Sequence, residues 1–192
     1  SPQDKKFNNE KTDLIIGDGN TIREFCTFNV GTIGGKGSTQ IGNNNWIMAY
    51  VHIAHDCMVG SDIVLANNSS LAGHVEVDDY AILGGFTLVH QFCKIGGHII
   101  TAVGTIVFKD VPPYIRAAGS NAKPNGINIE GLKRRNFSTQ SISDIKKAYK
   151  VLYREGNTID VAKGILLDLT KKTNEVNLFI DFLNKSNRGL IR

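Results

Sequence analysis

Histidine and carboxylate side chains, which can carry protons near neutral pH, come together in residues 49–60 of this 192-residue chain, AYVHIAHDCMVG. His55 is followed at once by Asp56 and preceded by His52. Imidazole titrates nearest neutral pH, so His55 is the candidate general base, and an adjacent carboxylate can fix its tautomer and stabilise its protonated form. Neighbours in a strand point to opposite faces, so we expect Asp56 to assist only where a turn breaks that alternation.

A six-residue repeat positions these side chains. Neither helices nor ordinary strands have this period, whereas in a hexapeptide repeat each unit forms a short strand and a turn, and three units close a triangular coil. The sequence therefore predicts a mainly β fold, a parallel β-helix with an aliphatic interior and with Thr101 as the one lapse. The repeating positions are Ile41, Ile47, Ile53, Val59, Leu65, Leu71, Val77, Leu83, Val89, Ile95, Thr101 and Val107.

Three repeats make one coil, so residues separated by three repeats stack in columns about 4.8 Å apart. By this rule His55 stacks over Gly73 and then over Gln91. Four of the five histidines lie along one face, and only His98 lies on another. The convergence predicts a functional site on the face that carries His52, His55, His74, His90 and Gln91.

A glycine-rich segment interrupts the repeat before the histidines. Ile16, Ile22 and Phe28 keep the period, and residues 31–39, GTIGGKGST, then replace roughly one repeat. This segment must project from a corner of the triangle, on the histidine side and one coil before His55. It lacks the GxxxxGK pattern and the following helix of a phosphate-binding loop, so phosphate binding is not expected here.

Composition favours a cytosolic protein. The three cysteines share one position of the repeat, and Cys57 and Cys93 would lie roughly 9 to 10 Å apart, beyond disulfide reach. We expect small buried thiols in a reducing compartment. The most apolar run, residues 95–108, is too short to span a bilayer, and no signal peptide is evident.

The repeat ends after Val107, where Pro112 and Pro113 supply no amide donors. We predict a β-helix domain over residues 1–120 and a helical domain over residues 121–192, which would cap the last coil and shield it from edge pairing.

Apolar residues at spacings of three and four predict helices over 138–155, 158–172 and 174–184, with Ser138 as the first N-cap and Gly156 as its stop. Residues 130–192 carry 13 Lys and Arg against 7 Asp and Glu. This excess favours an acidic partner about as strongly as it favours an ordinary solvated surface.

The segment GINIEGLKRRNF places two arginines, a carboxylate and an amide within eight residues. An arginine pair can bind a diphosphate through bidentate contacts, and a nearby amide and carboxylate can recognise a pyrimidine edge. A charge cluster at a helix start is the equally weighted structural alternative. Nucleic acid would require a broader basic stripe with aromatic residues. The residues are Asn128, Glu130, Arg134 and Arg135.

Several runs closely resemble the acyl-carrier-protein:UDP-N-acetylglucosamine O-acyltransferases that begin lipid A synthesis, over the whole range from Gln3 to Arg192. The resemblance implies a left-handed coil. The six-residue spacing does not show this hand, and right-handed crossovers are the usual rule. The runs are HIAHDCMVG (52–60), LANNSSLAGHVEVDD (65–79), VHQFCKIG (89–96), KDVPPY (109–114), NIEGLKRR (128–135) and RGLIR (188–192).

Carried over by motif, the resemblance implies that His55 takes a proton from the glucosamine 3-hydroxyl as it attacks an acyl thioester, that Asp56 supports His55, and that the Gly73 amide donates to the oxyanion. It implies no bound cofactor or metal. It also implies a homotrimer with sites between subunits, UDP-N-acetylglucosamine as acceptor, and the phosphopantetheine thioester of an acidic acyl carrier protein as donor. Sugar, phosphate and nucleotide would contact Gln3, Asp4, Lys6, His52, His74, His90, Gln91, Asn128, Glu130, Arg134 and Arg135.

Three features depart from the family pattern. The family begins several coils earlier, so we expect the chain to lack the family's N-terminal coils. Asn29 stands where relatives often have His near the acyl groove. Val103 lies in a stretch that is often glycine-rich, and we expect it to shorten the acyl chain that the groove accepts.

Other functions remain open at this point. A related UDP-sugar N-acyltransferase is less favoured, because its uridine-binding N-terminal domain has no counterpart here. A zinc site is the rival use of several histidines, as in hexapeptide-repeat carbonic anhydrases, although the tight HExxH spacing is absent. A passive scaffold would leave the histidine face unexplained. The acceptor can be a 3-hydroxyl or a 3-amino sugar.

Overall fold

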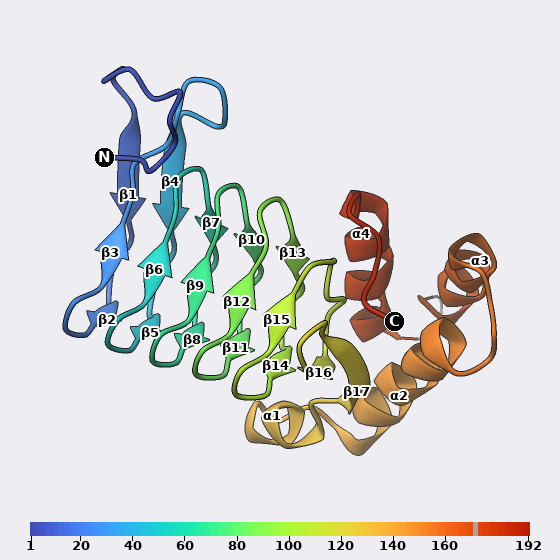
Figure 1. The fold of residues 1–192 in the computed structure, drawn as a ribbon. Coiled ribbons are helices and arrows are strands. Elements are labelled where there is room, and N and C mark those ends of the chain that lie inside the picture. The colour runs from blue at the N-terminus through green and yellow to red at the C-terminus, as the bar shows by residue number, and fades with distance from the viewer. Residues whose placement is uncertain (171–172) are drawn as a thin grey trace.

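The computed structural model describes residues 1–170 and 173–192. From β1 onward the chain winds into a three-sided coil of short parallel strands, with helices at its C-terminal end (Figure 1). Successive strands pass from one side of the triangle to the next, so that each side is a sheet of strands three elements apart. The predicted parallel β-helix with a helical C-terminal region is confirmed.

The three sides are called sheets A, B and C. Sheet A contains β1 (Asp13–Ile16), β4 (Ser38–Ile41), β7 (Met58–Val59), β10 (Glu76–Val77) and β13 (Lys94–Ile95). Sheet B contains β2 (Thr21–Ile22), β5 (Trp46–Ile47), β8 (Val64–Leu65), β11 (Ile82–Leu83), β14 (Ile100–Thr101), β16 (Ile115–Ala118) and β17 (Lys123–Ile127). Sheet C contains β3 (Thr27–Phe28), β6 (His52–Ile53), β9 (Ser70–Leu71), β12 (Leu88–Val89) and β15 (Ile106–Val107).

The residues that recur every six positions fill the interior of the coil. All twelve repeating residues from Ile41 to Val107 are buried, none of them more than 4% exposed. Strand pairs such as Ile53 with Leu71 confirm the predicted stacking of one coil on the next. The lapse at Thr101 has a physical reason, because its buried hydroxyl lies 2.7 Å from the Thr87 hydroxyl and accepts a hydrogen bond from the Gly84 amide.

The corners of the coil share one unusual backbone conformation. Every sixth residue from Asn44 to His98 has a φ angle between +56° and +66°, in the left-handed region that residues other than glycine seldom adopt. One such residue in each turn lets a short strand end and the next begin at an angle. One corner column, where sheet C passes to sheet A, contains Asp56, His74 and Phe92. Another, where sheet A passes to sheet B, contains Asp62, Tyr80 and His98.

The glycine-rich segment is an insertion at the first of these corners. Phe28 pairs with Ile53, 25 residues later, whereas Ile53 pairs with Leu71, 18 residues later, so the insertion adds seven residues. The loop spans residues 29–37 between β3 and β4. The predicted bounds of 31–39 were therefore wrong at the end, because Ser38 and Thr39 pair with Asp13 and Leu14 of β1 and belong to the sheet.

The coil ends in a hairpin and then in helices. β16 still pairs in parallel with β14, but β17 runs antiparallel to β16. This hairpin spans the boundary that the sequence places at residue 120, and that boundary remains a prediction. The helices are α1 (Ile129–Arg134), α2 (Thr139–Tyr153), α3 (Ile159–Thr170), the 3-10 turn η1 (Asn174–Val176) and α4 (Asn177–Lys185).

The predicted helices are present with modest shifts. Ser138 is the N-cap of α2, since its hydroxyl accepts from the Ser141 amide. The end predicted for the second helix, at residues 171 and 172, lies outside the described residues. The third helix begins at Asn177 instead of residue 174, because η1 winds the intervening residues more tightly.

The C-terminal segment packs back on the coil. The carboxylate of Asp110, which is fully buried, accepts hydrogen bonds from the Lys94 amide, the Ser186 hydroxyl and the amides of Asn187 and Arg188. Tyr114 donates to the Glu175 carbonyl oxygen and packs on Phe179. None of the described helices has the length and apolarity needed to cross a membrane.

The cysteines are free, as expected. Burial raises the pKa of Cys57 to about 12 and that of Cys93 to about 11, so both thiols stay protonated and unreactive at neutral pH.

Candidate active site

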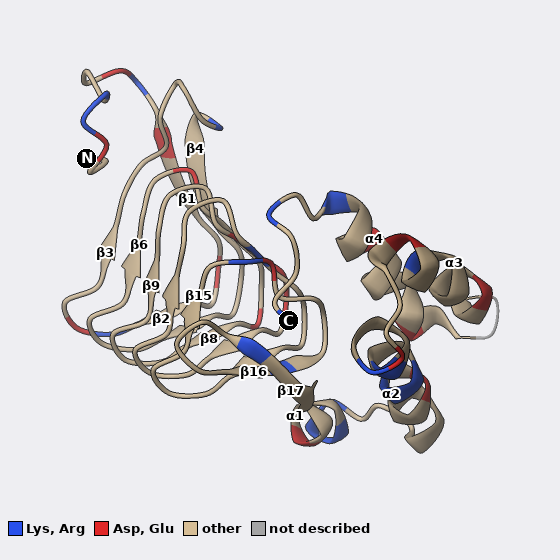
Figure 2. Ribbon diagram, turned by 45° about the vertical axis from the view of Figure 1, so that its right-hand side comes forward, with Lys and Arg blue, Asp and Glu red and all other residues tan. Residues whose placement is uncertain are grey.

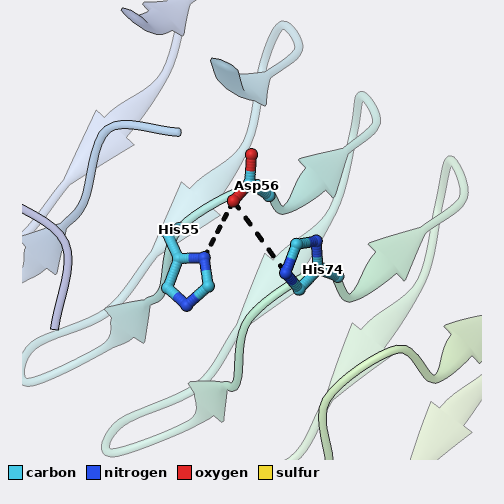
Figure 3. Close-up of side chains that lie close together, drawn as sticks. All are labelled: His55, Asp56 and His74. Atoms are coloured by element: carbon cyan, nitrogen blue, oxygen red, sulfur yellow. Dashed lines mark hydrogen bonds and ion pairs between the residues drawn. The ribbon is translucent and has the colours of Figure 1, made fainter. Parts of the chain in front are cut away.

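His55 and Asp56 face each other across a turn (Figure 3). The φ angle of Asp56 is +60°, which breaks strand alternation and brings its carboxylate to the same side as the preceding imidazole. His55 Nδ1 lies 2.8 Å from Asp56 Oδ2. The turn that the sequence required for this partnership is therefore present, and the contact leaves Nε2 as the ring nitrogen free for substrate.

The inserted loop surrounds the other side of the Asp56 carboxylate. Asp56 is fully buried and accepts from the Thr32 amide at 3.0 Å, the Thr32 hydroxyl at 2.7 Å and the Lys36 amide at 2.7 Å. Burial pushes the pKa of Asp56 upward, but the hydrogen bonds from His55, Thr32 and Lys36 outweigh it and hold the pKa below its usual value. The loop amides thus bind a protein carboxylate.

A glycine in this loop is required by close approach. A Cβ atom added to Gly35 would meet the Asp56 carboxyl group at less than van der Waals distance. Sequence reasoning did not identify Thr32 or Lys36 as site residues, because the inserted loop does not follow the stacking of residues in columns.

His74 occupies the same corner one coil later. Its ring stacks on Phe92 at 4.4 Å and meets the His55 ring edge-on at 5.1 Å, while Nε2 lies 4.0 Å from Asp56 Oδ2. Burial lowers the pKa of His74, although the Asp56 charge opposes that shift. His74 is therefore a neutral imidazole at pH 7 beside the His55–Asp56 pair.

Gly73 lies against His55, as the column rule predicted. A Cβ atom at Gly73 would sit 2.7 Å from Nε2 of His55, so any larger residue would displace the imidazole. Within the described chain the Gly73 amide donates no hydrogen bond, while the flanking amides of Ala72 and His74 donate to Val89 and His55. An unpaired N–H next to the free ring nitrogen is the feature that an oxyanion donor requires.

The N-terminal segment closes a pocket over this corner. Gln3, Asp4 and Lys6 line a cavity of about 630 Å³ together with His55, His74 and Gln91. In the structure the same chain supplies them, because residues 1–12 fold back over the corner.

The other two predicted histidines border the site. His52 lies in a neighbouring groove with Gln3 and Gly73, and its Nδ1 is 2.7 Å from the Thr27 hydroxyl. Burial lowers the pKa of His52. His90 sits one column away, with Nδ1 3.1 Å from the guanidinium of Arg188. Sequence reasoning did not connect Arg188 to this face, because the C-terminal segment returns from a distant part of the chain.

The four residues predicted to bind nucleotide are not at this corner. Asn128 is the N-cap of α1: its side chain accepts from the Gly131 amide and donates to the His98 carbonyl oxygen. Arg135 donates to the Tyr80 carbonyl oxygen at 2.8 Å and lies over the Tyr80 ring. Arg134 and Glu130 are outside the pocket that contains His55. In one chain this group lies at the corner between sheets A and B.

The two remaining positions that the sequence singled out lie at different corners of the coil. Val103 is at the corner between sheets B and C and is 77% exposed. Asn29 begins the inserted loop and is buried, and its Oδ1 has no hydrogen-bond partner among the described residues.

The same corner contains a possible metal donor set. One ligand atom each from His55, Asp56 and His74 lie within 4.8 Å of one another. Both Asp56 oxygens already accept two hydrogen bonds each, and the His55 nitrogen of this set is one of the donors. A cation would have to replace the His55–Asp56 hydrogen bond, so the arrangement fits an imidazole held by a carboxylate better than a metal centre.

The three-sided hexapeptide coil with a histidine and carboxylate at one corner defines a hexapeptide-repeat transferase. Residues 38–73 match the family model for the bacterial transferase hexapeptide (six repeats). Residues 110–191 match the family model described as UDP N-acetylglucosamine O-acyltransferase, domain 2. Relatives named acyl-(acyl-carrier-protein)–UDP-N-acetylglucosamine O-acyltransferase are more than 50% identical to the whole chain, which therefore belongs to that family.

One protein of that name from Thiobacillus denitrificans is 58% identical over the whole chain, which spans 74% of that protein. Another, from Janthinobacterium, is 53% identical, and the chain spans 75% of it. The solved structure of the Francisella novicida UDP-N-acetylglucosamine acyltransferase superposes with a TM-score of 0.97 at 45% identity, covering all of this chain and 70% of that one. The predicted family resemblance and enzyme class, acyltransferase, are confirmed.

Proposed function

We propose that this acyltransferase moves a 3-hydroxyacyl chain from acyl carrier protein to the 3-hydroxyl of UDP-N-acetylglucosamine, the first step of lipid A biosynthesis, with His55 as general base. The observation that carries the proposal is the left-handed turn at Asp56, which ties the carboxylate to His55 Nδ1 and leaves Nε2 facing the pocket. Nε2 takes the proton of the sugar hydroxyl while that oxygen attacks the thioester carbonyl.

The remaining steps use the residues around His55. The Gly73 amide donates to the oxyanion of the tetrahedral intermediate. When the carbon–sulfur bond breaks, the His55 imidazolium returns its proton to the departing phosphopantetheine thiolate. Asp56 keeps its charge throughout and stabilises the imidazolium, and no cofactor is needed.

The pocket suits a sugar. Gln3, Asp4 and Lys6 would contact the glucosamine from one side, and His74 and Gln91 from the other, since all five line the cavity over His55. His52 and His90 would extend this surface along sheet C towards the phosphates.

The nucleotide would be bound by a second copy of the chain. Asn128, Glu130, Arg134 and Arg135 do not line the sugar pocket in one chain, so they can complete it only from a neighbour. We propose a homotrimer with sites between subunits. Mixing His55→Ala subunits with Arg134→Ala subunits tests this: shared sites restore activity, while sites within one chain leave the mixture inactive.

The acidic carrier would dock on a basic cleft in the C-terminal region. The cleft holds about 690 Å³ between the β16–β17 hairpin, α1 and α2, and it is lined by Arg116, Lys133, Lys146, Lys150 and Arg154. Figure 2 shows basic residues on β16, α1 and α2. Reversing the charge at Lys146 and Lys150 should raise KM for the carrier and leave KM for the sugar nucleotide unchanged.

Acyl length would be limited by Val103. Its exposed side chain at the corner between sheets B and C would end the groove that the acyl chain enters. Val103→Gly should shift the rate preference towards longer acyl chains, and an unchanged preference would contradict this role.

The decisive experiment is incubation with UDP-N-acetylglucosamine and a panel of 3-hydroxyacyl carrier proteins, followed by the mass of the product. We expect one O-acylated product and none with His55→Ala. Product only from a 3-amino sugar would indicate the N-acyl variant. Absence of transfer in wild type and His55→Ala alike would support a scaffold. The reaction belongs in the cytosol, which agrees with three free cysteines.

A further inference from the structure

The loop over residues 29–37 gives the Asp56 carboxylate three of its four hydrogen bonds, yet little packing holds the tip of the loop in place. Thr32 is buried, but Ile33 at the tip is 70% exposed. Gly34, Gly35 and Gly37 give the free loop many conformations, and ordering it is correspondingly costly. Backbone hydrogen bonds of Gly31 and Gly37 with Asp13 hold the base of the loop, so a further contact matters most at the tip, where Lys36 lies.

Lys36 is anchored at both ends. Its amide donates to Asp56 Oδ1 at 2.7 Å, and its ammonium group donates to Glu76 Oε1 at 2.7 Å. Glu76 lies on β10, which is paired on both sides, with β7 and β13, within sheet A. The loop is thereby tied to the sheet by one side chain.

Glu76 also has a second cationic partner. Its Oε2 accepts from Lys94 Nζ on β13 at 2.7 Å, so one carboxylate bridges a loop lysine and a sheet lysine. Burial raises the pKa of Glu76, but the hydrogen bonds from Lys36 and Lys94 outweigh it and keep the carboxylate charged.

We propose that Glu76 is a positioning residue for acyl transfer: by binding Lys36 it holds the 29–37 loop on Asp56, and so holds His55 in its reactive orientation. This inference rests on the proposed function, because it assigns a role to the same His55–Asp56 pair. If the loop lifts, Asp56 loses three donors at once, and the carboxylate that orients His55 becomes hydrated and mobile.

The loop can be observed without any substrate. Amide hydrogen exchange at Lys36 reports how often its bond to Asp56 opens. Removing a partly exposed ion pair with Glu76→Gln should speed that exchange about threefold to fivefold. High salt should do the same in the wild type, because screening weakens the pair, and should have little further effect in Glu76→Gln.

Lys94→Met is the matched control. It removes a lysine from the same carboxylate at the same distance, but Lys94 lies on the sheet and not on the loop. Lys36 exchange and activity should both stay close to wild type. Equal exchange at Lys36 in Glu76→Gln and Lys94→Met, whether fast or slow, would overturn the proposal.

Charge reversal gives a rescue that a merely structural role would not. Glu76→Lys repels Lys36 and should lower kcat about tenfold with KM for the sugar nearly unchanged, because the base loses its orientation while the pocket remains. The triple change Lys36→Glu, Glu76→Lys and Lys94→Glu restores both pairs and should recover most of kcat and slow exchange. Failure of the triple variant to recover either quantity would contradict the proposed link between Glu76 and Lys36.

The two proposals fail in different ways. If the wild type shows no acyl transfer, the proposed function is wrong, whereas the exchange measurements still decide whether Glu76 holds the loop. If acyl transfer is present but kcat is the same in Glu76→Lys as in the wild type, the positioning role alone is wrong.

Discussion

Two corners of the coil hold a histidine in the same backbone conformation, yet they differ in chemistry. His74 and His98 have φ angles of +64° and +60°. His74 stacks on Phe92 and opens to a pocket beside Asp56. His98 is enclosed by Tyr80, Tyr114 and Phe137 at ring distances of 4.8, 5.5 and 5.2 Å.

The charges around the two rings explain the difference. Burial lowers the pKa of both histidines, but the Asp56 charge opposes that shift at His74, whereas Arg135 adds to burial at His98 and its pKa falls to about 4. The repeat thus supplies equivalent geometry at each corner. An inserted loop and an N-terminal segment surround one corner with hydrogen-bonding and charged groups, whereas aromatic rings and Arg135 surround the histidine at the other.

His55→Ala should give the largest effect on activity. Loss of a general base lowers kcat about 10²-fold to 10⁴-fold. The melting temperature should change little, because His55 contacts the pocket and not the coil interior. Steady-state kinetics and thermal unfolding measure the two quantities. Retention of more than a tenth of the wild-type kcat would remove His55 from the mechanism.

Asp56→Asn should be the next largest. The amide keeps the shape but turns an NH₂ group towards the donors of Thr32, Lys36 or His55, so the imidazole loses its charge partner. We expect kcat to fall about 10²-fold. Thr32→Ser, which preserves a hydroxyl donor, is the control and should stay within about threefold of wild type.

His98→Ala should show the opposite pattern to His55→Ala. Removing a ring that packs between three aromatic rings should lower the free energy of unfolding by about 2 kcal/mol. At saturating sugar nucleotide the kcat of the folded protein should be unchanged, since the His98 ring contacts Tyr80, Tyr114 and Phe137 and none of the groups around His55. Denaturant unfolding and kinetics on the same samples test this. A large loss of kcat in fully folded protein would show that His98 also affects the reaction at His55.

The pH dependence of stability should come from His98. His98 binds a proton in the unfolded chain below its ordinary value of 6.5, but in the folded protein only near 4. The unfolded state therefore binds more protons in this window, and stability that is complete above pH 6.5 is lost as pH falls towards 4.

His98→Phe keeps the aromatic packing and removes the titration. Its melting temperature should fall less between pH 7 and pH 5 than that of the wild type. An identical decline in both proteins would assign the acid sensitivity to other groups.

Removal of metal should have the smallest effect. A hydrogen-bonded imidazole and carboxylate need no cation, so chelator treatment followed by dialysis should leave kcat unchanged. Measurement of zinc in the purified protein is the companion test. Loss of activity on chelation and its return with zinc would show that the cluster of His55, Asp56 and His74 binds a metal ion.

Much of this comparison follows from the sequence. The period of six identified the buried residues, the column of His55, Gly73 and Gln91, and the separate location of His98. The turn at Asp56 was required by the chemistry but needed a backbone angle to establish, because strand periodicity says nothing about corners.

Contacts made by inserted and terminal segments were not predictable. The stacking of residues in columns did not predict where Thr32 and Lys36 lie, because the insertion shifts the register by seven residues. Arg188 reaches His90 from 98 residues away. Asp4 and Lys6 reach the pocket over His55 because residues 1–12 fold back over this corner, which the period of six does not predict.

The stacked corners also set fixed distances along the coil. Because each coil rises by the spacing of paired strands, about 4.8 Å, side chains along one corner stand at fixed multiples of that length from His55. A change of substrate therefore cannot be met by small continuous shifts of the backbone. It must be met by moving a contact to the next coil, or by changing the length of a side chain on a given coil.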